Sequence, residues 1–354
     1  MIKAINAAKS RVEIAIFRFD YHEIEMALAH AVNRGVSVHA LIAHTNRAGE
    51  QNLRKLEMRL LGAGVTVART ADDLPRYHGK LMIVDRKEAY VLAFNLTYAD
   101  IEHCRSFGIV TRNARLVSEA VRLFEADSSR RPYEPGIDTL VVSPLNARRQ
   151  LSAFIQGARK ELLIYDPKVS DPAMIRLLEE RARAGVDVRI IGKVTRKSSR
   201  LDVRKLSEWR LHTRTIIRDE HMAFVGSQSL REIELDQRRE IGIIFHDVRI
   251  VSQLAKTFYE DWLAGQQREE TAARKPAPAG KFAEKVAKEV IRELPPVAPV
   301  VTTVVKELVA RNGALLLDPE SVEETVSEAV KEAVKEAVEG VVEEAVEHTA
   351  AEAK

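Results

Sequence analysis

Apolar and polar residues along the first 266 positions follow a pattern that occurs twice. Each copy reads as a helix, an apolar strand, a second helix, a glycine turn and a further strand. This order is typical of parallel βαβ units in an α/β fold. A repeated unit of this length predicts two lobes with the same fold. The matching segments are 5–16 and 33–42 in the first copy, and 154–165 and 183–191 in the second.

A helical pattern closes each copy, and the two closing segments, 115–127 and 249–261, are similar residue by residue. Between the copies, 128–136 contains two prolines and a glycine, which mark a connection. The sequence therefore predicts a first lobe at 1–129, a linker at 130–136, a second lobe at 137–266, and a Pro/Ala-rich linker with an acidic amphipathic helical tail at 267–354.

Valines recur every fourth residue from Val322 to Val338 in the tail and form an apolar stripe. One interpretation is docking to a partner helix or to the body of the protein; the other is a loosely ordered acidic helix. The second is slightly favoured, because valine is a mediocre helix former. The acidic face argues against binding to anionic lipid.

Charge and cysteine content indicate which binding partners and which cellular compartment suit the chain. Segment 318–354 holds twelve acidic residues and three lysines, so its net charge is −9 and the rest of the chain, at +3 overall, carries +12. A basic body suits a phosphate-bearing partner, or is simply a solvated surface. The lone Cys104 forms no internal disulfide and no cysteine cluster for a metal, so a cytoplasmic setting is expected. The sequence shows no export signal and no apolar run long enough to span a membrane.

Two short motifs occupy equivalent places in the two copies. In each, a histidine precedes a basic residue by two positions in a strand-like run, so both side chains leave the same face. An aspartate follows at the same distance in both. The residues are His78, Lys80 and Asp85 in the first copy, and His212, Arg214 and Asp219 in the second, 134 positions later.

These motifs resemble the His-x-Lys-x-x-x-x-Asp signature of the phospholipase D superfamily, which usually occurs twice per chain. The resemblance covers about residues 1–264. It implies a mixed β-sheet flanked by helices in each lobe, and a pseudo-twofold axis that brings both motifs into one cleft. It also implies phosphodiester cleavage without a metal or other cofactor.

The resemblance implies a role for each motif residue. One histidine attacks phosphorus and the other protonates the leaving alcohol; His78 is expected as nucleophile and His212 as acid, although the roles could be exchanged. Lys80 and Arg214 would bind phosphate oxygens. The motif aspartates join this catalytic set, but an aspartate after a strand often only caps a turn, so a supporting role is preferred for Asp85 and Asp219.

Other family positions match less evenly. Superfamily members usually carry Gly-Ser-x-Asn on the strand after the motif, which implies substrate contacts for Asn95, Ser227 and Gln228. An acidic residue that orients a catalytic histidine matches Glu240, whereas the equivalent in the first lobe is Ser106, so one histidine is expected to lack a carboxylate.

Three functions fit this sequence. The preferred one is a phospholipase D-type phosphodiesterase or phosphatidyltransferase, cytoplasmic or peripheral at a membrane surface, with a phospholipid headgroup as substrate. The second is a nuclease of the same superfamily, which the basic body favours. The third is a non-catalytic module that binds phosphate ligands, which the departures at Ser106, Arg214 and Gln228 favour.

Overall fold

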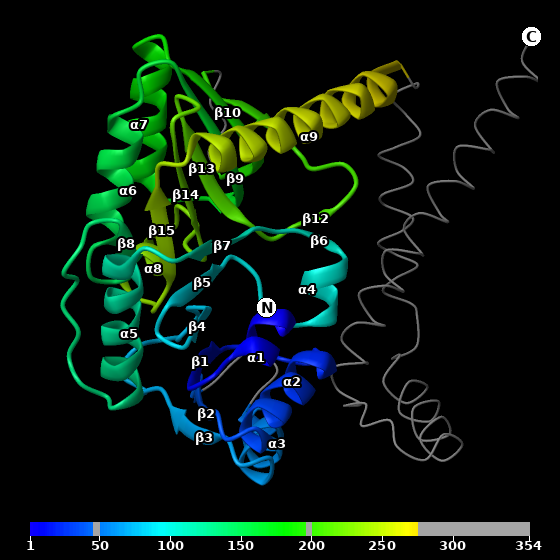
Figure 1. Ribbon diagram of the computed structural model, residues 1–354. Helices are drawn as coiled ribbons and strands as arrows, with labels where there is room; N and C mark the ends of the chain where they lie inside the picture. The colour runs from blue at the N-terminus through cyan, green and yellow to red at the C-terminus, as the bar shows by residue number, and fades with distance from the viewer. Residues whose placement is uncertain (45–49, 196–199, 275–354) are drawn as a thin grey trace, which may run out of the picture. The chain divides into compact units, whose positions relative to one another are not determined.

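Strands with apolar residues on both faces build the two sheets of this chain, whose computed structural model describes residues 1–44, 50–195 and 200–274 (Figure 1). In the first sheet three parallel strands are followed by three that alternate in direction. Its strands, in spatial order, are β3 (Thr66–Arg69), β2 (Ser37–Ile42), β1 (Arg11–Ile16), β4 (Leu81–Val84), β5 (Glu88–Leu92) and β7 (Gly108–Thr111).

The second sheet repeats this order of directions and adds one strand at its edge. The fold class expected from the sequence, two tandem α/β lobes with mixed sheets, is therefore confirmed. The strands are β11 (Asp202–Arg204), β10 (Asp187–Val194), β9 (Glu161–Val169), β13 (Arg214–Arg218), β14 (Met222–Gly226), β15 (Ile241–Phe245) and β8 (Leu140–Val142).

Successive side chains of a strand point to opposite faces, and both faces of each sheet are buried. On β4, Met82 contributes to an outer core between the first sheet and its helices, whereas Leu81 and Ile83 contribute to an inner core. On β13, Ile216 and Ile217 divide in the same way. This explains why the strands read as continuous apolar runs in the sequence.

Helices cover the outer face of each sheet (Figure 1). Their apolar residues recur at helical spacing and pack on the outer cores. On the first sheet these are α1 (Ile2–Ala7), α2 (His22–Asn33) and α3 (Glu50–Gly62), and on the second α6 (Ala147–Gln156) and α7 (Pro172–Arg183).

One apolar layer lies between the two sheets and joins the lobes. Strand β5 of the first sheet packs against β14 and β15 of the second. The closing helices α5 (Ala114–Ser128) and α9 (Val248–Arg274) contribute residues to the same layer, including Phe124 and Phe258. Because 1–266 forms one unit around this layer, groups from different lobes can be held at fixed distances.

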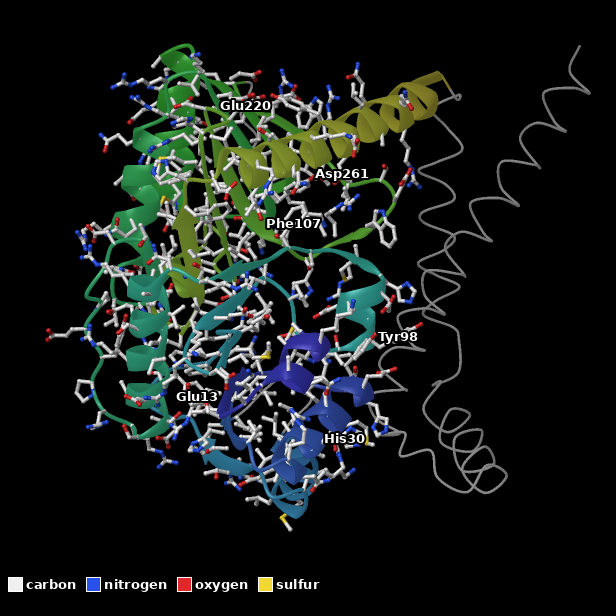
Figure 2. All side chains as sticks on the ribbon, in the orientation of Figure 1. Glu13, His30, Tyr98, Phe107, Glu220 and Asp261 are labelled. Carbon is white, nitrogen blue, oxygen red and sulfur yellow. The ribbon has the colours of Figure 1, made fainter. Side chains whose placement is uncertain are left out.

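A short two-stranded sheet also crosses between the lobes. It pairs β6 (Cys104–Arg105) with β12 (Arg210–Leu211) in parallel. Asp261 of α9, on the side facing the lobe boundary (Figure 2), accepts hydrogen bonds from the Arg105 guanidinium at 2.7 Å and the Tyr165 hydroxyl at 2.6 Å. These contacts fix the segment that precedes the second motif.

The motif aspartates Asp85 and Asp219 lie in the turns that end β4 and β13. Both have left-handed backbone, with φ of 51° and 54°, which aspartate tolerates better than most residues in such turns. Their carboxylates bind backbone N–H groups at the start of β1 and β9, and these bonds, against the effect of burial, lower the pKa of Asp85 to about 2. The donors are Lys9, Ser10 and Arg11 for Asp85, and Arg159, Lys160 and Glu161 for Asp219.

Both aspartates therefore stand at the opposite ends of β4 and β13 from the motif histidines. Among the described residues, neither carboxylate has a hydrogen bond to His78 or His212. The expectation that these aspartates belong to the catalytic set is therefore corrected. Their role is structural, because each carboxylate ties its turn to the start of the neighbouring strand.

The last described helix is longer than the sequence suggested. Helix α9 runs from Val248 to Arg274, the last described residue, and so passes the expected start of the linker at 267. The predicted valine stripe and its possible partner helix lie outside the described residues. None of the helices in the described ranges is long and apolar enough to cross a membrane.

Candidate active site

The first motif places a histidine and a lysine directly before β4. A bridge between Tyr77 and Arg239 of the other lobe holds this segment, and the His78 N–H donates to the Arg239 carbonyl at 2.7 Å. The Lys80 ammonium lies 2.8 Å from His78 Nε2 and donates to the His78 carbonyl at 2.8 Å. Lys80 is only 2% exposed, so its charge is held inside the protein beside the imidazole.

The second motif repeats this arrangement with an arginine. The His212 N–H donates to the carbonyl of Arg105, again from the other lobe, at 3.2 Å. The Arg214 guanidinium donates to the His212 carbonyl at 2.7 Å and to the Ser229 hydroxyl at 3.2 Å. The backbone of each histidine is therefore fixed by the opposite lobe, and its basic neighbour folds back onto it.

Each histidine also meets a carboxylate from the opposite lobe. His78 Nδ1 lies 2.8 Å from Glu240 Oε2, and His212 Nδ1 lies 2.8 Å from Asp100 Oδ1. A carboxylate accepts the Nδ1 proton, so the Nε2 atom of a neutral imidazole carries the lone pair. The expectation that one histidine lacks a carboxylate, based on Ser106, is therefore wrong.

Asp100 replaces the missing carboxylate from a different element. It lies on α4 (Tyr98–Glu102), whose N-cap Thr97 accepts a hydrogen bond from the Asp100 N–H. Its second oxygen accepts hydrogen bonds from the Asn95 side chain at 2.7 Å and from the Asn95 backbone at 3.1 Å. Asn95 therefore lies at the site and orients Asp100, and its contact with substrate stays a prediction.

The internal repeat points to Asp100, although the two histidine motifs do not include it. Position 234, which is 134 residues later, is also acidic, and Glu234 lies on the equivalent helix α8 (Glu232–Asp236). Its carboxylate accepts from the Ser229 N–H at 2.8 Å, just as Asp100 accepts from Asn95. In the second lobe, however, Glu240 reaches the histidine, and Glu234 pairs with arginines.

Ser227 and Gln228, both predicted to contact substrate, lie close to Glu240 and within the second sheet. The Ser227 hydroxyl accepts the Ile241 N–H at 3.1 Å. The Gln228 side chain donates to the Val141 carbonyl at 3.0 Å, within the second sheet. Gln228 therefore does not stand where Asn95 stands in the first lobe; Ser229 does, and the predicted alignment was one residue out of register.

Burial controls the protonation of the two motifs. It lowers the pKa of His78 well below the ordinary value, with help from the positive charges of Lys80 and Arg214. Burial also lowers the pKa of His212, to about 4, although the hydrogen bond that His212 donates to Asp100 opposes this. It lowers the pKa of Lys80 to about 7 although Glu240 opposes this. At neutral pH both imidazoles are therefore neutral in the unliganded site.

The two carboxylates respond differently to the same burial. Burial raises the pKa of Glu240, against the effects of Lys80 and Ser227. Burial acts in the same direction on Asp100, but hydrogen bonds from His212 and Asn95 outweigh it and leave the Asp100 pKa below its usual value. The carboxylate beside His212 is thus held firmly as an anion.

An aromatic ring that the sequence reading missed also contacts the site. The Phe17 ring meets the His78 ring edge to face, with centroids 4.6 Å apart, and the Lys80 ammonium lies 5.7 Å from the Phe17 centroid. Phe17 follows β1, so the first strand as well as the motif helps to fix the orientation of His78.

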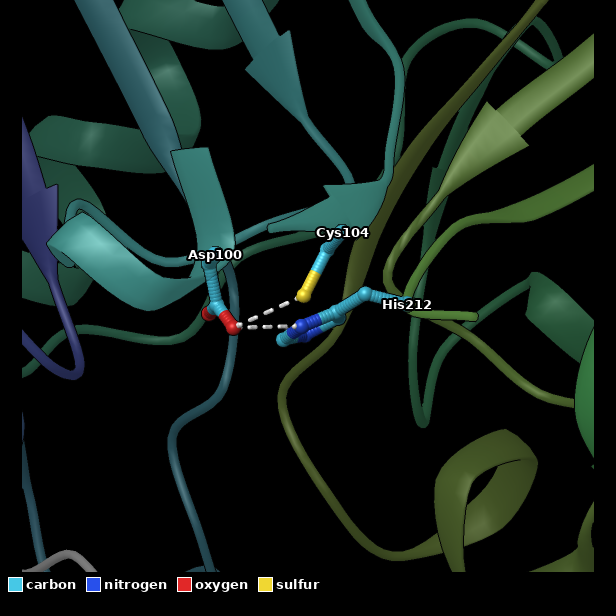
Figure 3. A group of neighbouring side chains, drawn as sticks. All are labelled: Asp100, Cys104 and His212. Carbon is cyan, nitrogen blue, oxygen red and sulfur yellow. Dashed lines mark hydrogen bonds and ion pairs between the residues drawn. The ribbon is translucent and has the colours of Figure 1, made fainter. Parts of the chain in front are cut away.

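One group of side chains in the described ranges could hold a metal ion. The ligand atoms of Asp100, Cys104 and His212 lie within 4.8 Å of one another (Figure 3). Cys104 Sγ is 3.7 Å from Asp100 Oδ1. A thiol, an imidazole and a carboxylate are a suitable donor set for zinc, although no metal ligands were expected from the sequence.

Comparisons with other proteins agree with the duplicated architecture. The model of the family described as cardiolipin synthase, PLD-like domain, matches residues 1–128 and 151–262. No curated protein matches the chain.

Two solved structures show a similar fold. Polyphosphate kinase from Porphyromonas gingivalis has a TM-score of 0.61 and 19% identity, covering 73% of this chain and 47% of that one, so this chain spans about half of its length. Phosphatidylserine synthase from Haemophilus influenzae Rd KW20 has a TM-score of 0.56 and 13% identity, covering 72% and 81%. With the family match over most of the chain, these findings show that the protein belongs to the PLD-like domain family of cardiolipin synthase, within the phospholipase D superfamily of phosphodiesterases and phosphotransferases.

Proposed function

We propose that this protein cleaves or exchanges the phosphodiester bond of a phospholipid headgroup through a covalent phosphohistidine. The observation that carries this proposal is the pair of carboxylate-bound histidines, each with a basic neighbour two residues on, the buried Lys80 and the partly buried Arg214. A phosphodiester is anionic and resists attack, so its cleavage needs cations for its oxygens, a nucleophile and an acid. His78, Lys80, His212 and Arg214 supply these groups.

In the first step His78 Nε2 attacks phosphorus, a P–N bond forms, and the bond to the leaving oxygen breaks. The Nδ1 proton, held by Glu240, puts the lone pair on Nε2, and this lone pair is released for the attack when the Lys80 ammonium turns from Nε2 to the phosphate oxygens. Lys80 and Arg214 bind the non-bridging oxygens, and these cations are the reason why the step is expected to proceed in a chelator.

In the second step a water or an alcohol attacks the phosphohistidine, the P–N bond breaks, and His78 is restored. His212 gives its Nε2 proton to the leaving oxygen in the first step and takes a proton from the incoming group in the second. An anionic substrate favours the protonated form of His212, and the Asp100 anion stabilises the imidazolium. Water gives hydrolysis, and an alcohol gives transfer.

Exposed aromatic residues support a lipid substrate. Tyr98, at the surface of α4 (Figure 2), is 59% exposed, and Trp209, directly before β12, is 42% exposed. These short elements also carry Asp100 and lead into His212. Tyrosine and tryptophan are suited to a boundary between apolar and aqueous phases.

Several arginines near the motifs form ion pairs within the protein, so their charges are already neutralised. This argues against a groove that binds nucleic acid. Free cations along a groove are what a DNA backbone requires. Arg105 binds Asp261, Arg239 binds Asp127, and Arg231 and Arg238 bind Glu234.

The substrate class can be tested with vesicles and DNA in the presence of EDTA. We expect headgroup release from phosphatidylglycerol vesicles by the wild-type protein and none by His78→Ala. Tyr98→Ala with Trp209→Ala should raise the apparent KM for vesicles by about tenfold or more, because burial of an aromatic side chain is worth roughly 1–3 kcal/mol. The same double variant should keep its activity on the soluble diester bis-p-nitrophenyl phosphate. Cleavage of duplex DNA with intact lipid would instead establish a nuclease.

The charge of Lys80 should give the reaction an alkaline limit. Because the Lys80 pKa is about 7, the cation is present below that pH and is lost above it. KM for the soluble diester should therefore rise above about pH 7. Lys80→Arg, which copies the second motif, stays charged, so its KM should remain flat to about pH 9, whatever its kcat.

Arg214→Lys is the matched control for this pH profile. It should introduce a second loss of charge and steepen the rise in KM. An identical alkaline limb in the wild type and in Lys80→Arg would rule out Lys80 as its origin.

A further inference from the structure

We infer that Asp100, Cys104 and His212 form a binding site for Zn²⁺, and that zinc bound there switches off the second catalytic histidine. The metal-binding part stands on the geometry of the cluster alone. The inhibitory part rests on the proposed role of His212.

The positions of the ligand atoms favour this inference. Asp100 Oδ1 lies 2.8 Å from His212 Nδ1 and 3.7 Å from Cys104 Sγ. Tetrahedral zinc, with bonds of about 2.0–2.3 Å, holds its ligands about 3.3–3.8 Å apart. Replacing the shared proton by a metal therefore requires the carboxylate and the imidazole to move apart by only about half an ångström, through side-chain rotation.

Chemistry and access also fit zinc. A thiolate and an imidazole are preferred by zinc over magnesium or calcium, which bind oxygen ligands. The two negative charges of Asp100 and a deprotonated Cys104 balance the charge of Zn²⁺. Asp100 and His212 are 3% and 8% exposed, whereas Cys104 is half-buried and is therefore the most accessible of the three ligands.

Few contacts around the cluster must change when the metal binds. The Cys104 thiol, which donates to the Ala99 carbonyl at 3.4 Å, gives up this hydrogen bond on deprotonation. Asn95 holds the other carboxylate oxygen, Oδ2, and so fixes the ligand oxygen toward the metal. The ion pair between Asp100 and the Arg210 guanidinium is long at 3.9 Å, and the Arg210 side chain is 55% exposed. Arg210 can therefore turn to solvent without a large loss.

The second lobe carries a cation where the first has the thiol. Position 238, which is 134 residues after Cys104, is an arginine whose guanidinium lies 3.5 Å from Glu234. A guanidinium repels a metal ion. The cluster at His212 therefore has no equivalent at His78 among the described residues, and a metal would act on only one of the two histidines.

Zinc at His212 Nδ1 would block the proposed proton transfer. With a proton on Nδ1, His212 can be an imidazolium that gives up its Nε2 proton and becomes neutral. With zinc on Nδ1, loss of the Nε2 proton would leave an imidazolate, which makes a much weaker acid. Zinc would also displace the hydrogen bond between Asp100 and His212. Removal of zinc by a chelator should restore both the proton transfer and the hydrogen bond between Asp100 and His212.

The test compares metal binding in the reduced wild-type protein, in Cys104→Ser and in His103→Ala. His103 is an exposed imidazole next to the cluster and controls for surface binding. We expect one equivalent of Zn²⁺ in equilibrium dialysis against ZnCl₂, and a thiolate-to-metal absorption band when CoCl₂ is used. Cys104→Ser should lose the band. It should also bind zinc at least about tenfold more weakly, because loss of a group that only supports a metal ligand already costs about that much. His103→Ala should match the wild type.

Inhibition is measured on bis-p-nitrophenyl phosphate, with and without ZnCl₂. We expect zinc to inhibit the wild type and His103→Ala reversibly, and to leave Cys104→Ser active. Equal zinc affinity in wild type and Cys104→Ser, or a cobalt complex without the thiolate band, would overturn the site. A wild type that binds zinc through Cys104 but is not inhibited by it would overturn the switch. Thiolate-dependent zinc binding in a protein that cleaves no diester would uphold the site and reject the proposed catalytic function alone.

Discussion

His78→Ala is expected to lower kcat for bis-p-nitrophenyl phosphate by more than about 10⁴-fold, because it removes the nucleophile. His212→Ala should still release a first equivalent of nitrophenolate, which leaves without a proton, but its steady turnover should fall because the second step lacks its base. On a lipid, whose alcohol needs the proton, the same change should cost roughly 10²–10⁴-fold. Nitrophenolate release and headgroup release are the two measurements.

Trapping the covalent intermediate identifies which histidine is the nucleophile and which is the acid. After reaction with bis-p-nitrophenyl phosphate and an alkaline quench, mass spectrometry should find a nitrophenyl phosphoryl group on His78 in His212→Ala, because the second step then lacks its base. The same group on His212 in His78→Ala would mean that the two roles are exchanged. His103→Ala serves as the control for loss of an unrelated imidazole.

Asp100→Asn and Glu240→Gln are each expected to lower kcat on lipid by roughly 10²–10⁴-fold, because an amide in place of the carboxylate can bind the wrong imidazole tautomer and no longer stabilises the imidazolium. The effects should cross between the lobes. Asp100→Asn should resemble loss of His212 and let phosphohistidine accumulate, whereas Glu240→Gln should resemble loss of His78 and prevent its formation.

Ser106→Ala is the matched control for these two changes. Ser106 stands at the place equivalent to Glu240, and its hydroxyl is buried without a hydrogen-bond partner. We expect wild-type kcat from Ser106→Ala. A loss comparable to that of Asp100→Asn would show that Ser106, rather than Asp100, supports His212.

The local parts of this structure could be predicted because they depend on neighbours in the sequence. A spacing of two residues puts His78 and Lys80 on one side of the chain, and apolar runs such as β4 give the strands. The partner of His212 could not be found in this way, because Asp100 lies 112 positions away and reaches it only through the packing of the lobes. Gln228 was misplaced since family spacing was used instead of the internal repeat, which aligns Asn95 with Ser229.

The exchange of carboxylates between lobes makes the two halves of the site interdependent in evolution. If a single lobe worked as a symmetric dimer, each substitution would appear in both halves at once, and loss of the carboxylate at the position of Glu240 would affect both histidines. In one chain a substitution happens once. The first lobe can thus use a shorter acid from a helix while the second uses a glutamate that directly precedes β15, and each histidine keeps its carboxylate. Joining two copies in tandem gives an enzyme the freedom to become asymmetric.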